Sequence, residues 1–212
     1  MVTTMINRWS DIKEKYGVTL ADPVAKNYYE DVENRVYWLD YDFVDEMADA
    51  PIDIIKLITK YNIEDIGLPY EERRPFIIYI NSGGGDLFVC SSVIEAMQTS
   101  KTPIWTVNVC RACSAAAIIL MAGHRRFGFK GSTVMVHRGS TFLGGETSVV
   151  ESTQAYIKKL DKRVDEFMFA KTTINQKEYK KKASSDMYFD DNEALNNHII
   201  DELVNDYEVF DR

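Results

Sequence analysis

Two residues of the chain combine the type and the predicted position needed for nucleophilic catalysis, Ser114 and His137. Ser114 stands where a predicted strand meets an almost wholly apolar helical stretch that runs to Met121. A serine in that position can simply cap the helix. The same position would also put its hydroxyl at the positive end of the helix dipole, beside backbone N–H groups that have no partner in the helix. Those groups could stabilise the oxyanion formed when the hydroxyl attacks a carbonyl, so Ser114 is a candidate nucleophile as well as a candidate cap.

The chain has only three histidines among which to seek a general base. His124 follows Gly123 and precedes two arginines, which predicts an exposed turn, and His198 lies in a predicted tail helix. His137 ends an apolar strand, where its side chain would point into a cleft at the sheet edge; a purely structural histidine is the alternative. A supporting carboxylate cannot be selected by chemistry alone from 33 Asp and Glu residues.

A second loop that could do chemistry runs from Asn81 to Asp86 and contains three consecutive glycines. Glycines let the backbone approach a ligand closely and turn its N–H groups toward an anion. A tight turn without a ligand is the alternative. The dinucleotide-binding fingerprint does not fit, because Phe88 stands where its third glycine belongs.

Cys110 and Cys113 suggest a zinc site or a redox site. Zinc would need further ligands that no second cysteine pair or paired histidines supply, and a redox motif would need a thioredoxin-like context. We therefore predict no metal and no cofactor, with Cys113 as a weaker alternative nucleophile. With Cys90 these residues form an odd, irregular set, which indicates a reducing compartment rather than a disulfide framework.

The elements that must position these residues alternate between strand and helix. Apolar runs predict strands at 35–39, 76–80, 104–110 and 133–137. Helical spacing predicts helices at 6–16, 43–61, 86–97, 114–121 and 146–171. Pro51 must start or break the second of these helices. The run at 76–80 is apolar on both faces, which predicts a sheet covered by helices on both sides. Such alternation is typical of a mostly parallel α/β sheet, whose sites form at the carboxyl ends of the strands.

Length and composition fit one large domain with an ample core: 212 residues, of which 45% are hydrophobic. The net charge of −8 indicates an acidic surface, which disfavours nucleic acid and anionic membranes as partners. The first 16 residues lack a signal-peptide stretch, and no window offers the ~18 apolar residues of a membrane span. The sequence therefore predicts a cytoplasmic protein.

Four separated segments resemble the Clp protease proteolytic subunit family, and they follow the family's order. The matching segments are Tyr79–Gly85, where the family has Y-I-N-S-P-G-G; Ala112–Ser114 with the alanine-rich stretch to Gly123; Val134–His137, similar to the family's M-I-H; and Asp186–Phe189 with the downstream Glu193, Ala194, Ile200 and Asp201. The spacing from Gly85 to Ser114 and from His137 to Asp186 also matches the family pattern.

The resemblance implies a serine endopeptidase that hydrolyses unfolded polypeptides or short peptides. Ser114 would be the nucleophile, His137 its general base, and Asp186 the carboxylate that orients the imidazole. Backbone groups around them would stabilise the oxyanion and bind the substrate. The N–H groups of Gly85 and Ala115 would form the oxyanion hole, and the loop at Gly83 and Gly84 would pair with an extended peptide.

The same resemblance implies a crotonase/ClpP-like stacked β-α spiral with a projecting long handle helix. Residues 1–27 would be an N-terminal segment and 205–212 a C-terminal tail. The peptidase domain would span 28–204, with its head at about 28–140 and 173–204 and its handle helix at about 146–172. Family members form heptameric rings stacked in pairs around a closed chamber, which an AAA+ unfoldase feeds.

Two departures from the family pattern carry their own expectations. Gly83 stands where the family has proline, which predicts a looser glycine loop. Ser184 and Ser185 replace a charged pair that the family uses at its ring–ring contact, which puts stacking of the rings in question. Two other functions stay open at this point: a non-catalytic or regulatory ring subunit, and a crotonase-type acyl-CoA enzyme, whose fold shares the spiral and the backbone oxyanion hole.

Overall fold

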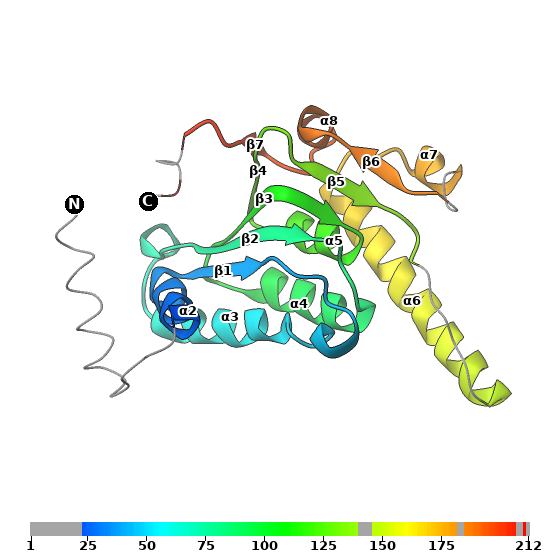
Figure 1. Cartoon of the computed structure of the whole chain (residues 1–212), viewed down its shortest axis with the longest axis horizontal. Coiled ribbons are helices and arrows are strands. Elements are labelled where there is room, and N and C mark those ends of the chain that lie inside the picture. Colours follow the sequence, from blue (N-terminus) through cyan, green and yellow to red (C-terminus); the bar gives the residue numbers. More distant parts are fainter. Residues whose placement is uncertain (1–22, 140–145, 182–184, 207–209, 211–212) are drawn as a thin grey trace. The chain divides into compact units, whose positions relative to one another are not determined.

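The computed structural model describes residues 23–139, 146–181, 185–206 and 210 (Figure 1). The chain divides into two compact units, residues 1–36 and 37–212. In the first unit the described part consists of helix α2 (Pro23–Asn34), Arg35 and the first residue of strand β1 (Val36–Leu39). The helix predicted at 6–16 lies outside the described residues. The domain boundaries at residues 28 and 204 stay predictions.

The second unit is built around a largely parallel sheet, as the sequence predicts. Its strands run in the order β1-β2-β3-β4-β7, and β5 joins β3 to β6. The strands are β2 (Phe76–Ser82), β3 (Ile104–Cys113), β4 (Arg125–Gly128), β5 (Thr133–Val136), β6 (Met187–Phe189) and β7 (Glu202–Leu203). The pairs β2–β3, β3–β4, β3–β5 and β4–β7 are parallel, whereas β5 and β6 pair antiparallel.

Strand β3 changes partner along its length. Its first half, from Trp105 to Asn108, pairs with β4, and its last three residues, from Arg111 to Cys113, pair with β5. Since β2 occupies the opposite edge of β3, the two partners must follow one another along a single edge. The sheet therefore forks at β3 (Figure 1), and the β5–β6 ribbon diverges from β4 and β7.

Three helices stack on one another against the sheet. Helix α5 (Ala115–Met121) is buried throughout and packs on β2 and β3; α4 (Leu87–Thr99) packs beside α5, and α3 (Ile52–Glu64) packs on α4. Asp86 caps α4, since its carboxylate accepts the Val89 N–H at 2.9 Å. Pro51 precedes α3 directly, so the predicted helix at 43–61 is instead a short 3₁₀ turn followed by α3.

A second apolar cluster lies on β2, β3 and β4, where it is formed by Ile77, Val107 and Phe127. Val204 and Phe210 of the C-terminal segment pack against it. The sequence predicts helices on both sides of these strands. Here the C-terminal segment, and not a helix, covers part of this face of the sheet.

Helix α6 (Thr147–Lys171) matches the predicted handle, with 25 residues of which only Leu160 and Met168 are buried. Two shorter helices follow, α7 (Gln176–Lys181) and α8 (Asp191–Asn196). The turn predicted at His124 ends sooner than expected, because the two arginines that follow it begin strand β4. None of the helices in the described part of the chain combines the length and hydrophobicity needed to span a bilayer.

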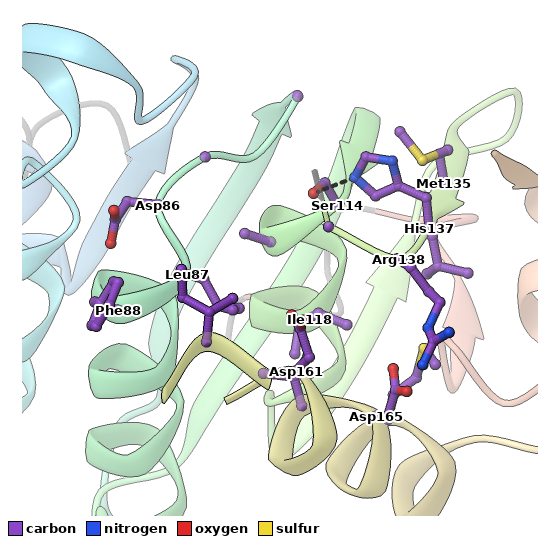
Figure 2. Close-up of a pocket in the computed structure, with 18 of the residues that line it drawn as sticks. Asp86, Leu87, Phe88, Ser114, Ile118, Met135, His137, Arg138, Asp161 and Asp165 are labelled. Carbon is purple, nitrogen blue, oxygen red and sulfur yellow. Dashed lines mark hydrogen bonds between the residues drawn. The ribbon is translucent and has the colours of Figure 1, made fainter. Parts of the chain in front are cut away.

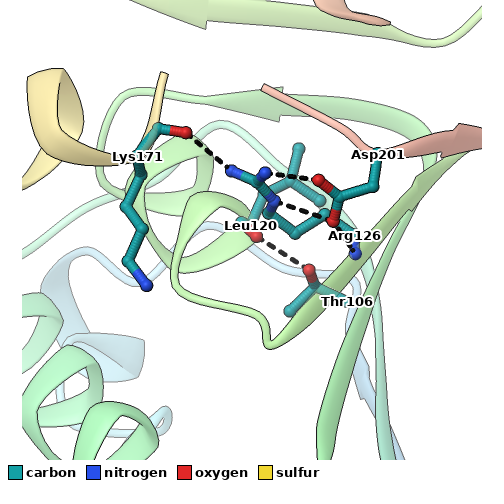
Figure 3. A network of polar contacts seen from close by, with 5 residues as sticks. All are labelled: Thr106, Leu120, Arg126, Lys171 and Asp201. Atoms are coloured by element: carbon teal, nitrogen blue, oxygen red, sulfur yellow. Dashed lines mark hydrogen bonds and ion pairs between the residues drawn. The ribbon is translucent and has the colours of Figure 1, made fainter. Parts of the chain in front are cut away.

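Arg126 on β4 ties three elements of the second unit together (Figure 3). Its guanidinium makes a two-pronged contact with Asp201, next to β7, and donates to the Lys171 carbonyl at the end of α6, at 3.1 Å. The Asp201 carboxylate also accepts the Arg126 backbone N–H at 2.8 Å. The Arg126 side chain is only 11% exposed, so these bonds are sheltered from water.

Replacing Arg126 by alanine should lower the free energy of unfolding by about 2–3 kcal/mol, because three charge-assisted bonds disappear at a nearly buried site. The adjacent Arg125 is a matched control, since it pairs with Glu202 at 2.6 Å but is more exposed. Arg125→Ala should cost about 1 kcal/mol. Urea unfolding measures both values, and equal losses would contradict the role given to Arg126.

Candidate active site

Ser114 lies in the tight connection between β3 and α5, in a backbone conformation that few residues other than glycine adopt. Its φ is 53° and its ψ is −126°. The Ser114 N–H donates to the Met135 carbonyl at 2.8 Å, which fastens the turn to β5. Its hydroxyl makes no capping bond to α5, so the structure does not support the helix-cap alternative.

The Ser114 hydroxyl instead faces His137, which follows β5 directly (Figure 2). Ser114 Oγ and His137 Nε2 are 2.8 Å apart, and His137 Nδ1 lies 3.2 Å from an Asp186 carboxylate oxygen. If Nδ1 carries the ring proton and donates a hydrogen bond to Asp186, Nε2 is left as an acceptor for the serine hydroxyl. The structure thus brings together all three residues that the resemblance singles out.

The pairing of β5 with β6 explains how Asp186 reaches the imidazole. Val136 stands opposite Met187 in this antiparallel pair, so the residues just beyond, His137 and Asp186, are also neighbours. Tyr188 OH lies 3.4 Å from the second carboxylate oxygen of Asp186. This local pairing cannot be read from the sequence, because β6 is only three residues long.

Tyr179 on α7 supports the histidine from behind. Its hydroxyl lies 3.1 Å from the His137 carbonyl oxygen and 3.1 Å from an Asp165 carboxylate oxygen, and it can donate to one of them at a time. Burial, reinforced by the charge of Asp165, raises the pKa of Tyr179 well above its usual range, so the hydroxyl keeps its proton. Sequence reasoning missed Tyr179, because a tyrosine in a lysine-rich helical stretch gives no functional signal.

The glycine loop lies against the Ser114 turn. A Cβ on Gly84, whose φ is 95°, would lie 2.6 Å from the Cys113 carbonyl oxygen and 2.9 Å from the Ala115 nitrogen. Only glycine allows this approach. The Ala115 N–H is the first of α5 and has no partner within the helix. The bonds that attach Phe43 to the loop use the Gly84 carbonyl and the Asp86 N–H, and so leave the Gly85 N–H unused.

A cavity of about 500 Å³ opens beside Ser114 and His137 (Figure 2). Its apolar lining includes Leu87, Phe88, Ile118, Val164 and Met168. Figure 2 shows Arg138 extending toward Asp161 and Asp165 of α6, at the far side of this lining. Burial raises the pKa of both carboxyls, and the positive charge of Arg138 opposes the rise.

The other histidines and the cysteines take no part in this arrangement. The His124 ring is held by the Ile104 N–H at 3.1 Å and the Met97 carbonyl at 3.0 Å, and His198 lies in the turn after α8 rather than in a helix. Cys90 is buried beneath α5, where its thiol lies 3.4 Å from the Ala115 carbonyl. Among the described residues no three His, Cys, Asp or Glu side chains cluster as a metal site would require.

The close approach at Gly84 can be tested with a matched pair of variants. Gly84→Ala and Gly131→Ala both force a side chain into the left-handed region, at φ of 95° and 82°, but only Gly84 has neighbours within 4 Å. Each should cost roughly 1 kcal/mol of stability from backbone strain. Labelling of the Ser114 hydroxyl by a fluorophosphonate should fall at least tenfold in Gly84→Ala and stay unchanged in Gly131→Ala. Wild-type labelling of Gly84→Ala would contradict the packing described here.

Comparison with known proteins agrees with this geometry. The family model "Clp protease" matches residues 68–207. Among curated relatives, the chain is 24% identical over 203 residues to an ATP-dependent Clp protease proteolytic subunit 1 of Cutibacterium acnes, which covers 94% of this chain and 88% of that protein. It is 24% identical over 175 residues to an ATP-dependent Clp protease proteolytic subunit of Deinococcus radiodurans, which covers 82% of this chain and 81% of that protein.

A third relative, the proteolytic subunit 2 of Frankia casuarinae, is 29% identical over 133 residues, which are 62% of this chain and 61% of that protein. These comparisons favour neither the regulatory subunit nor the acyl-CoA enzyme, since each of these relatives carries the name of a proteolytic subunit. The family model covers the glycine loop, the Ser114 turn, β5 and β6 in one continuous match. The chain belongs to the Clp protease family and is a Clp-type proteolytic subunit.

Proposed function

We propose that this subunit is an active serine endopeptidase, with Ser114, His137 and Asp186 as its catalytic triad. The observation that supports this most directly is the contact of 2.8 Å between Ser114 Oγ and His137 Nε2, with Asp186 at 3.2 Å on the other side of the ring. A misaligned triad would lack the first contact. With the imidazole proton on Nδ1, Nε2 would accept the serine proton.

In the proposed reaction, Ser114 Oγ attacks the carbonyl carbon of a peptide bond while His137 Nε2 takes its proton. Asp186 holds the Nδ1 proton and stabilises the imidazolium that forms. The oxyanion lies against the N–H groups of Gly85 and Ala115, and each such donor is typically worth ~10²–10³ in rate. The imidazolium then protonates the leaving amine. Water hydrolyses the acyl-enzyme in the same way, with His137 again as base.

The substrate would be an unfolded polypeptide or a short peptide, bound in an extended conformation along the glycine loop. The N–H groups of Gly83 and Gly84 donate to Asp42 and to the Ser82 hydroxyl. Since the Gly84 carbonyl already accepts the Phe43 N–H, the loop would offer the peptide the Gly83 carbonyl. Main-chain pairing of this kind tolerates many sequences. The cavity beside Ser114 would receive the side chain next to the scissile bond, against its apolar lining.

Cys113 is a weaker candidate for the nucleophile than Ser114. Burial raises the pKa of its thiol, which disfavours the reactive thiolate. The contact of His137 Nε2, moreover, is with Ser114. No metal or cofactor takes part in the proposed reaction.

Ser114→Ala should abolish fluorophosphonate labelling and cleavage of fluorogenic peptides, because it removes the attacking oxygen. Cys113→Ala, the neighbouring control, should keep both. Circular dichroism of the two variants checks that each is folded. Cleavage that persists in folded Ser114→Ala would move the nucleophile elsewhere and overturn the assignment.

We propose further that the subunits assemble into heptameric rings, stacked in pairs, and that an AAA+ unfoldase feeds the chamber in the cytoplasm. The names of the relatives, which are ATP-dependent Clp proteases, support an ATPase partner. Exposed apolar residues on α6 support association between subunits, since Val149 is 55% and Tyr156 51% exposed. Ser184 lies outside the described residues, so stacking rests on the resemblance.

Native mass spectrometry should find seven or fourteen copies of the 24.3 kDa chain in one particle. Val149→Asp should shift the particle toward smaller species, since a charge would then have to enter the apolar contact. Glu151→Asp, an exposed and conservative change on the same helix, is the control. A wild-type protein that remains monomeric at high concentration would contradict the ring model.

A further inference from the structure

The glycine loop is held by a bond that a proline at the same place could not make. The backbone N–H of Gly83 donates to the Asp42 carboxylate at 2.5 Å. Proline has no N–H to donate. The sequence predicts a looser loop because Gly83 replaces the family's proline, but the structure adds an anchor at this residue.

Asp42 and the next residue, Phe43, together hydrogen-bond to several residues of the glycine loop. Next to Asp42, the Phe43 N–H donates to the Gly84 carbonyl at 2.9 Å, and the Phe43 carbonyl accepts the Asp86 N–H at 3.0 Å. A Cβ on Gly85 would lie 2.0 Å from that carbonyl oxygen, so the two backbones are in close contact. Phe43 itself is fully buried, which makes it a fixed support.

Asp42 also connects the loop to the strand that carries the nucleophile. Its carboxylate lies 3.5 Å from the guanidinium of Arg111, on β3. Arg111 is three residues before Ser114 and stands opposite Thr133 of β5. The Asp42 carboxylate therefore contacts both sides of the proposed oxyanion hole, the loop with Gly85 and the strand that leads to Ala115.

We infer that Asp42 is a positioning residue. By holding the Gly83 N–H it fixes the start of the glycine loop, next to the Gly84–Gly85 peptide that Phe43 holds, and it is itself oriented by Arg111. The inference rests on the function proposed above. It adds a residue outside the triad and outside the glycine loop, on a segment far from both in the sequence. Without Asp42, nothing described in the structure holds the Gly83 N–H, and the bonds to Phe43 alone are left to keep the Gly85 N–H directed at the oxyanion.

Three substitutions and a control can test the bond between the Gly83 N–H and the Asp42 carboxylate. Asp42→Ala removes the acceptor, Asp42→Asn keeps an acceptor oxygen, and Gly83→Pro removes the donor. The carboxylate would lie 2.9–3.1 Å from a Cβ at position 83, so Gly83→Pro also needs Asp42 to yield space. Asp40→Ala, an exposed carboxylate two residues away, is the control for lost charge.

We expect kcat for a fluorogenic peptide to fall roughly ten- to hundredfold in Asp42→Ala with KM nearly unchanged, because the loss appears only when the oxyanion forms. A peptide boronate, which forms a tetrahedral adduct with the serine hydroxyl, should bind more weakly by a similar factor. Asp42→Asn should recover most of both. The double variant Asp42→Ala/Gly83→Pro should be more active than the product of the two single effects, since each change removes the same bond.

The outcomes separate this inference from the proposed function. A lower kcat and weaker boronate binding in Asp42→Ala, with both recovered in Asp42→Asn and neither changed in Asp40→Ala, support the inference. An Asp42→Ala enzyme with wild-type kcat and wild-type boronate affinity overturns it and leaves the peptidase assignment intact. A wild-type protein that is folded but neither labelled nor active overturns both.

Discussion

The change of partner along β3 is the constraint on which the site depends. The strand pairs with β4 up to Asn108 and with β5 from Arg111. Its last residue, Cys113, therefore lies opposite Met135, two residues before His137. The bond from the Ser114 N–H to the Met135 carbonyl continues this pairing past the end of the strand. Nucleophile and base are therefore placed by backbone register, and their side chains need only adopt suitable rotamers. The short β6 extends the same logic to Asp186, through its pairing with β5.

Around this frame, the chain holds the reacting groups through their backbones as much as through their side chains. Tyr179 contacts the carbonyl of His137, and Phe43 contacts the backbone of the glycine loop on both sides of Gly85. Such contacts limit where a group can move without altering its chemistry. They suit a reaction in which preorganised dipoles stabilise charge at the moment it develops.

The sequence predicts a large part of this picture. The apolar run at Phe76–Ile80, the glycine loop and the apolar helix after Ser114 are strong local signals, and their alternation predicts a parallel α/β sheet. Ser114 and His137 are candidates from their predicted positions, whereas Asp186 follows from the resemblance alone, since chemistry could not choose among the carboxylates. Strand β4 was missed because Arg125 and Arg126 give it no apolar pattern; it pairs with β3 and β7, and Arg126 also contacts Asp201 and Lys171. Asp42 and Tyr179 could not be found, because their roles come from contacts across long stretches of chain.

The three cysteines differ sharply in their surroundings, and this difference has a practical consequence. Cys110 is exposed, Cys113 is partly covered, and Cys90 is fully enclosed between α4 and α5, where burial raises the pKa of its thiol to about 12. An alkylating reagent attacks the thiolate, so Cys90 is protected both by its enclosure and by its proton. The folded chain therefore carries a built-in reporter of its own integrity: modification of Cys90 registers the separation of the two helices directly beneath the nucleophile.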